Sequence, residues 1–204
     1  VIEEFNGAAA PEIRGAFDGA CRVLQQLGAD LVPLRLSPLE TYAGCGRLIL
    51  QAEGFAVHEQ WLRTRAADYG MRGRTRLLPG AFLGASDYLR AQQLRTVLAR
   101  EFAAAMAGVD AAVCVSSLEL PCRIDDEAEV DRTYDRQART PFNVTGTPAI
   151  SVPMGFSQGG LPMGLQVAGR AFDEAMVYRV ANAYEGATDW HLRRPDLQAC
   201  CAGH

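Results

Sequence analysis

The chain has 204 residues, of which 49% are apolar and 22% are charged, a composition typical of a folded globular domain. Its formal net charge of −4 argues against a general nucleic-acid binder, because such a protein needs a basic surface to neutralise phosphates. All twenty basic residues are Arg, and no Lys occurs. A Walker-type phosphate loop, Schiff-base chemistry and a Ser–Lys catalytic pair within these residues are therefore excluded.

The first third of the chain is expected to alternate between helix and strand. Apolar spacing predicts a helix over 8–27 and a buried strand over 29–36. Ser37 is expected to cap a second helix that covers 37–61. The Arg-rich segment 63–76 is predicted to be a solvated loop or a short helix.

The middle of the chain is predicted to hold one long helix and one short strand. The helix covers 86–108, with an apolar stripe that includes Leu89, Val97 and Phe102. The apolar run 111–115 is short enough for a buried strand. The acidic segment 118–139 is predicted to be irregular.

The last part of the chain has the clearest local pattern. Residues 148–153 and 163–169 are predicted to pair as an antiparallel hairpin around the Gly-rich turn 155–160. Asp173 is expected to cap a final helix. The alternation of helices and strands predicts an α/β fold with a mixed sheet, and no linker divides the chain into two domains.

The six Cys residues form no CxxC motif, and the chain is too long for a disulfide-stapled miniprotein. They are interpreted as reduced thiols of a cytoplasmic protein. A metal site of Cys200, Cys201 and His204 is the alternative, but a polar tail is favoured, so no metal and no other cofactor is expected. No apolar run reaches the roughly 20 residues that span a bilayer, and no signal peptide is visible.

The Ser residues show no catalytic pattern. Ser37 and Ser86 are interpreted as helix caps, and Ser151 as a strand residue. Ser116 and Ser117 end a strand without a flanking glycine that would free a backbone oxyanion hole. No GxSxG elbow occurs and the three His residues are scattered, so nothing points to a Ser-His-Asp triad.

The segment 140–195 carries the most specific pattern in the chain. It contains FNVTGTPA at 142–149, then the predicted hairpin, then GR at 169–170 and FDE at 172–174. This segment closely resembles the C-terminal hallmark of the amidase-signature family, which includes acyl-amide hydrolases and a component of the tRNA-dependent amidotransferase, its A-type subunit. The upstream segments LGAD, EGFAVHEQWLRTRAADY and DYLRAQQLR also fit the family in order, so the resemblance covers nearly the whole chain.

The resemblance implies the C-terminal portion of the family's α/β/α fold, with a mixed sheet flanked by helices. Residues 1–204 would form part of one amidase domain whose N-terminal catalytic half is absent. The sequence itself, apart from the resemblance, predicts a disordered tail over 196–204. The implied reaction cleaves carboxylic amide C–N bonds by acyl transfer: Ser attacks, and Lys acts through a second Ser in a cis peptide. No catalytic residue carries over, because these groups belong to the family's N-terminal half. The chain alone is expected to hydrolyse no amide.

The resemblance also suggests residues near the pocket. Contacts with a small-molecule amide are predicted for Arg76, Phe142, Asn143 and Thr145. Scaffold roles are predicted for the hallmark residues Gly146, Pro148, Gly164 and Gly169. Packing in the sheet is the favoured role of all these residues, and substrate contact is the alternative.

Two other functions remain open at this stage. One is a non-catalytic α/β binding module derived from an amidase, and the other is an amidotransferase A-type subunit that works with tRNA. Absence of the catalytic half predicts an exposed apolar face or an unpaired strand edge. No nucleic-acid or membrane partner is expected, and a homodimer is left open.

Overall fold

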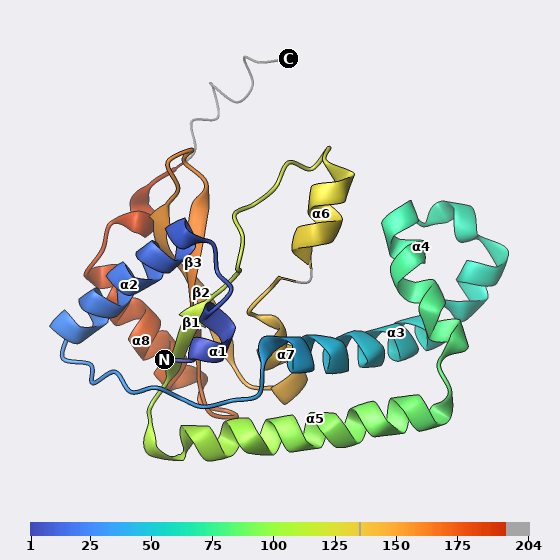
Figure 1. The fold of residues 1–204 in the computed structure, drawn as a ribbon, viewed down its shortest axis with the longest axis horizontal. Helices are drawn as coiled ribbons and strands as arrows, with labels where there is room; N and C mark the ends of the chain where they lie inside the picture. The colour runs from blue at the N-terminus through green and yellow to red at the C-terminus, as the bar shows by residue number, and fades with distance from the viewer. Residues whose placement is uncertain (135, 195–204) are drawn as a thin grey trace.

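The computed structural model describes residues 1–134 and 136–194. It contains a small antiparallel sheet with the strand order β1 (Ala112–Val115), β3 (Pro162–Ala168), β2 (Ala149–Phe156), on the left in Figure 1. The predicted hairpin is confirmed, since β2 and β3 are its two strands. The predicted mixed sheet is wrong for the described residues, because both strand pairs are antiparallel. Helices predominate in this part of the chain.

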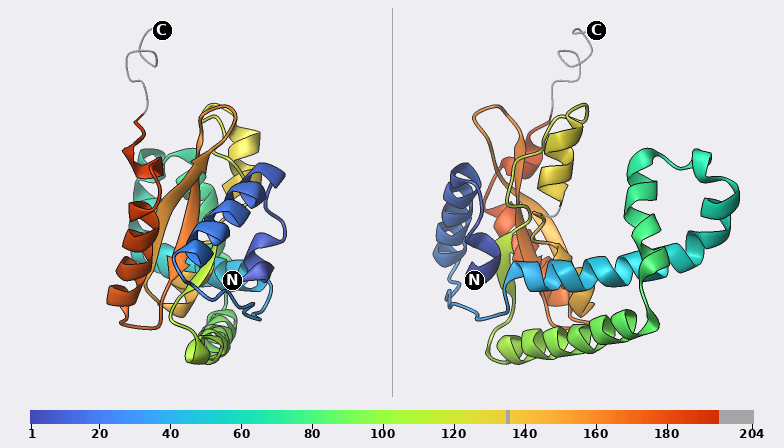
Figure 2. Two further views of the ribbon diagram at one scale, coloured as in Figure 1. Left: turned by 90° about the vertical axis from the view of Figure 1, so that its left-hand side faces the viewer. Right: turned by 45° about the vertical axis from the view of Figure 1, so that its right-hand side comes forward.

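Two helices cover the same apolar face of the sheet: α2 (Pro11–Gln26) and α8 (Glu174–Gly186) (Figure 2). Leu165 and Val167 of β3 point to this face and are fully buried. A Cβ atom built on Gly155 would lie 3.7 Å from Cβ of Ala16 in α2. Apolar spacing on the two helices therefore predicts the packing correctly, and the side chain of Asp173 caps α8 as expected.

The N-terminal segment covers the outer edge of β1. The short helix α1 (Glu3–Asn6) places Asn6 so that its Oδ1 accepts a hydrogen bond from the Val115 amide at 2.9 Å. The predicted strand 29–36 is wrong, because only Leu34 forms a bridge, to Ile2. Pro33 has no N–H to donate, which limits ladder formation here.

A helical arm extends away from the sheet in Figure 1 and in the right-hand view of Figure 2. Its elements, in chain order, are α3 (Leu39–Thr64), η1 (Ala66–Asp68), α4 (Met71–Leu77), η2 (Leu78–Phe82), α5 (Ala85–Ala105) and η3 (Met106–Gly108). The long helix predicted from Ser86 is confirmed as α5, and α4 is the short helix predicted within 63–76.

The start of α3 differs from its prediction. Ser37 does not cap the helix; its hydroxyl instead donates to Glu101 of α5 at 3.0 Å. Tyr42 donates to the other carboxylate oxygen of Glu101, also at 3.0 Å. Burial and this hydrogen bond raise the pKa of Tyr42, so its hydroxyl stays protonated and available as a donor. A tertiary contact between helices thus replaces the local cap.

The arm exposes apolar side chains. Val57 of α3 is 70% exposed and Phe82 at the tip is 88% exposed. The predicted apolar stripe of α5 is only partly buried, because Leu98 and Phe102 are covered while Leu89 is 60% exposed. The outer strand β2 pairs with β3 alone within the described residues. The expected exposed apolar surface and unpaired strand edge are therefore both confirmed.

Three further elements complete the described residues: α6 (Glu127–Tyr134), α7 (Thr140–Thr145) and η4 (Trp190–Leu192). Helix α6 lies in the segment that was predicted to be irregular, so that prediction is wrong there. Within the helix, Arg132 forms an ion pair with Glu129, and this pair stabilises one helical turn of the acidic segment. The predicted tail 196–204 lies outside the described residues. None of the described helices is both long and apolar enough to cross a membrane.

Candidate functional site

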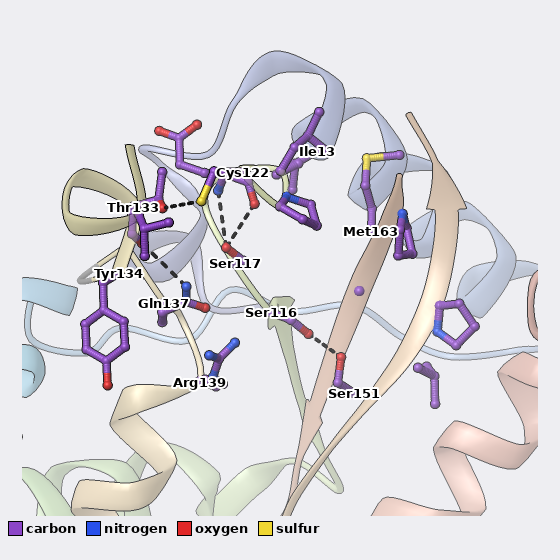
Figure 3. Close-up of a pocket in the computed structure, with 18 residues that line it drawn as sticks. Ile13, Ser116, Ser117, Cys122, Thr133, Tyr134, Gln137, Arg139, Ser151 and Met163 are labelled. Atoms are coloured by element: carbon purple, nitrogen blue, oxygen red, sulfur yellow. Dashed lines mark hydrogen bonds between the residues drawn. The ribbon is translucent and has the colours of Figure 1, made fainter. Parts of the chain in front are cut away.

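A cavity of about 500 Å³ opens between the hairpin, the end of β1 and helix α6 (Figure 3). One wall is apolar and includes Ile13, Leu120, Pro121, Val130, Val152, Pro153, Pro162 and Met163. The polar lining includes Ser116, Ser117, Thr133, Gln137, Arg139 and Ser151. An apolar pocket with a few convergent polar groups is the usual form of a small-molecule site.

Two serine hydroxyls meet in this cavity, one from Ser116 directly after β1 and one from Ser151 of β2. Ser116 Oγ and Ser151 Oγ lie 2.6 Å apart (Figure 3). Since one hydroxyl donates to the other, the pair retains one proton that it can donate to a ligand, together with free acceptor lone pairs. The pair can therefore bind a carbonyl or an amide group.

Gly164 makes room for the serine pair. A Cβ atom at this position would lie 2.6 Å from Ser151 Oγ and 2.8 Å from Ser116 Oγ. Both distances are shorter than real Cβ atoms show, so a side chain would displace the hydroxyls. This contact gives a physical reason for one residue that the resemblance assigned to the scaffold.

We expect Gly164→Ala to lower the free energy of unfolding by about 1–3 kcal/mol, as overpacking of a filled site does. The cause is displacement of both hydroxyls by the new methyl group. Urea denaturation followed by circular dichroism measures the change. The control is Gly15→Ala, because a Cβ there meets nothing within 4 Å. Equal stability of the two variants would contradict the assigned role of Gly164.

Within the described part of the chain, the serine pair forms no hydrogen bond with a His or a carboxylate. His58 interacts with the Tyr69 hydroxyl, 2.8 Å away, on the arm, and His191 lies in η4; neither lines the cavity. A serine nucleophile needs an adjacent base or a lowered pKa. The described residues therefore provide binding groups but no activated nucleophile.

The loop that follows β1 is tied to α6 by ion pairs. Glu119 lies 2.7 Å from Arg136 Nε and 3.1 Å from Arg132 Nη1. Ser117 Oγ donates to the Glu119 carbonyl at 3.0 Å. These contacts fix the rim of the cavity and neutralise the carboxylate that lines it.

A second cavity of about 430 Å³ lies between α3, α5 and α7. Tyr134, Gln137 and Arg139 line both cavities, so the segment that joins α6 to α7 forms part of a shared wall. Asn143, a predicted substrate contact, lines the second cavity.

The structure does not bring the four predicted contact residues together. Phe142 is buried in the core, where its ring packs against Phe5 and Phe102. Arg76 stacks on the Tyr134 ring, with its guanidinium carbon 3.1 Å from the ring centroid. Thr145 hydrogen bonds to Thr147 at 2.8 Å. Substrate contact by these residues stays a prediction, and a packing role is the plainer interpretation of Phe142.

The remaining hallmark residues shape the chain around α7 and the hairpin. Gly146 ends α7 with a φ of 72°, which glycine adopts without strain. The Pro148 carbonyl accepts a hydrogen bond from the Gly169 amide at 2.9 Å. A Cβ on Gly169 would lie 2.6 Å from a methyl group of Val177. Gly169 therefore allows α8 to approach the sheet.

The cysteines and acids give no sign of a metal centre in the part of the chain that the structure covers. No group of three His, Cys, Asp or Glu side chains there could hold an ion. Cys21, Cys45, Cys114 and Cys122 are free thiols, and burial raises the pKa of Cys114. The alternative metal site of Cys200, Cys201 and His204 lies outside the described residues.

Sequence reasoning missed the pairing of Ser116 with Ser151. These residues are 35 positions apart and meet because β1 and β2 both pair with β3. The predicted hairpin carries part of this signal, since it places Ser151 opposite Gln166. The pairing of β1 with β3 has no local signal.

Comparison with known proteins identifies the family. The family model described as Amidase matches residues 1–178. The A-type subunit of the glutamyl-tRNA(Gln) amidotransferase of Thermosynechococcus vestitus is 32% identical, with 92% of this chain and 44% of that protein covered. The corresponding subunit of Chloroflexus aggregans is 34% identical, with 96% of this chain and 45% of that protein covered. The chain thus spans less than half the length of these curated relatives.

Solved structures agree with this result. An amidase crystal structure superposes with a TM-score of 0.79 at 25% identity, covering 88% of this chain and 43% of that one. The A-type subunit of the glutamyl-tRNA(Gln) amidotransferase of Thermotoga maritima gives a TM-score of 0.72 at 28% identity, covering 90% of this chain and 41% of that one. From its sequence and its fold, the chain belongs to the amidase-signature family.

Proposed function

We propose that the chain is the C-terminal segment of an amidase-family hydrolase that cleaves the C–N bond of small carboxylic amides. Ser attacks the amide carbonyl, and Lys, acting through a second Ser, moves the proton to the leaving amine; water then releases the acid. The attacking Ser, the second Ser and the Lys come from residues outside Val1–His204. The described residues supply the scaffold and one wall of the substrate site.

This proposal rests on one observation: the chain matches the family but lacks the groups that would catalyse the reaction. Residues 1–178 match the family model, yet the chain contains no Lys. The Ser116–Ser151 pair, which is the best-placed hydroxyl group, has no base beside it in the described residues. A segment that provides binding groups but no activated nucleophile is expected to hold the substrate while the catalytic groups come from another part of the protein.

The test uses the gene itself. The reading frame upstream of the Val1 codon is sequenced, and the longest in-frame product is purified and assayed with simple amides. We expect an upstream Lys and a Gly/Ser-rich loop, and turnover that is lost when that Lys is replaced by Ala. A start codon at or just before Val1 would contradict the proposal and favour a non-catalytic module.

The relatives favour a second candidate function. The two curated relatives named above are A-type subunits of a glutamyl-tRNA(Gln) amidotransferase. In that case the released ammonia would pass to a partner protein rather than to solvent. The extended protein would then need that partner to transfer the amide nitrogen to charged tRNA. Unchanged free ammonia release with and without the partner would exclude this candidate.

A further inference from the structure

Arg139 lies in the wall that the two cavities share. It lines the cavity of the serine pair and also the cavity between α3, α5 and α7. Figure 3 shows its side chain among the residues that line the first cavity. A cation at this point can reach a ligand in either cavity.

The other charged groups nearby are engaged. The charged lining of the two cavities consists of Glu53, Arg47, Arg95, Glu119 and Arg139. Glu119 is neutralised by Arg132 and Arg136, and Glu53 accepts a hydrogen bond from the Tyr88 hydroxyl at 2.8 Å. Arg95 donates to the Val144 carbonyl at 2.8 Å.

Arg139 differs from these groups. Within residues 1–134 and 136–194 its guanidinium has no hydrogen bond, ion pair or ring contact. A guanidinium group keeps its charge at every physiological pH, and its planar set of donors matches the two oxygens of a carboxylate. Arg139 is therefore placed to bind an anionic group of a ligand.

Gln137 adds an acceptor at the same wall. Its Nε2 donates to the Thr133 carbonyl at 3.4 Å, which orients the amide because a carbonyl accepts only from that nitrogen. Its Oε1 is buried and has no partner in the described residues. A buried acceptor without a donor is unfavourable, and an N–H group of a ligand would satisfy it.

We propose that this junction binds a small amide that also carries a carboxylate. Arg139 binds the carboxylate, Gln137 Oε1 accepts from the amide N–H, and the Ser116–Ser151 pair hydrogen bonds to the amide carbonyl. The inference deepens the proposed function, on which its amide portion rests, by naming the substrate class.

The test measures binding to the purified 204-residue chain with two matched probes. Succinamate carries one amide and one carboxylate, whereas succinamide carries two amides and no charge. Titrations followed by amide chemical shifts in 15N-labelled protein give both dissociation constants. We expect succinamate to bind at least about tenfold more tightly, as one charge-assisted bidentate pair provides.

Two Arg variants distinguish binding of the carboxylate by Arg139 from a general effect of positive surface charge. Arg139→Gln should abolish the preference for succinamate, whereas Arg90→Gln should retain it, because Arg90 is exposed like Arg139 but lines neither cavity. Ser151→Ala should weaken both probes to a similar extent. Equal affinity for the two probes, an unchanged preference in Arg139→Gln, or no binding of either probe would overturn the inference.

Binding is measured without turnover, so the two proposals can fail separately. A charge preference that depends on Arg139, combined with an inactive extended protein, would refute hydrolysis alone. An active extended protein without that preference would refute the carboxylate site alone.

Discussion

Replacing Phe142 by Ala is expected to lower the free energy of unfolding by about 3–5 kcal/mol, the cost of removing a buried aromatic ring. Phe142 is 4% exposed and makes edge contacts with two rings, Phe5 at 6.3 Å and Phe102 at 5.9 Å between centroids. It joins α1, α5 and α7 at the base of the arm. Urea denaturation followed by circular dichroism measures the loss.

The adjacent residue provides the control. Asn143 is exposed on the same helix, so Asn143→Ala should change the stability by less than about 0.5 kcal/mol. If Phe142→Ala lowered the free energy of unfolding as little as Asn143→Ala, the ring would not be part of the core. The hallmark residue Phe142 would then have to be reconsidered as a substrate contact.

Gly80→Ala is expected to destabilise the arm by about 3 kcal/mol, at the upper end of overpacking costs. A Cβ atom on Gly80 would lie 2.1 Å from the Gln51 carbonyl oxygen and 2.5 Å from Cβ of Phe55. Both obstacles belong to α3, so the tip of the arm would have to move away from that helix. Hydrogen exchange of the α3 amides near Gln51, together with the urea midpoint, measures the effect.

A second glycine of the arm should show the opposite sign. Gly44 lies inside α3 and a Cβ there meets nothing within 4 Å. Gly44→Ala should therefore raise the stability by about 0.5–1 kcal/mol through its higher helix propensity. A loss of stability in Gly44→Ala similar to that in Gly80→Ala would mean that the arm packs differently.

The elements that the sequence predicts correctly have local signals. The hairpin follows from alternating apolar residues around a Gly-rich turn, and α8 follows from the Asp173 cap. Gly28 adopts a φ of 91° just after α2, as a glycine at the end of a helix often does. In each case the responsible residues lie within a few positions of one another.

The predictions that fail depend on distant partners. The apolar run 29–36 resembles a strand, but its backbone finds only one bridging partner, Ile2. Ser37 lies where a helix cap is expected, but its hydroxyl donates to the carboxylate of Glu101 in α5 instead. The stripe on α5 includes Leu89, which no described element covers. Local spacing cannot tell which apolar face will meet a neighbour.

The candidate site could not be predicted from local sequence patterns either. The resemblance marks Gly164 as a scaffold residue, but the reason for a glycine there is the position of two hydroxyls, that of Ser116 just after β1 and that of Ser151 in β2. Ser116, Ser151 and Arg139 carry no motif of their own. They become a candidate site only because the sheet order and the segment between α6 and α7 bring them to one cavity.

The most direct test of the scaffold role is the amide hydrolase activity of the purified Val1–His204 chain. Its release of ammonia from simple amides, succinamate included, is compared with that of the Ser116→Ala and Ser151→Ala variants. We predict no release above the buffer background for all three proteins, because the described residues place no base beside the serine pair. Turnover by the unaltered chain that disappears in either variant would contradict the scaffold role, since it would establish a complete active centre within these residues.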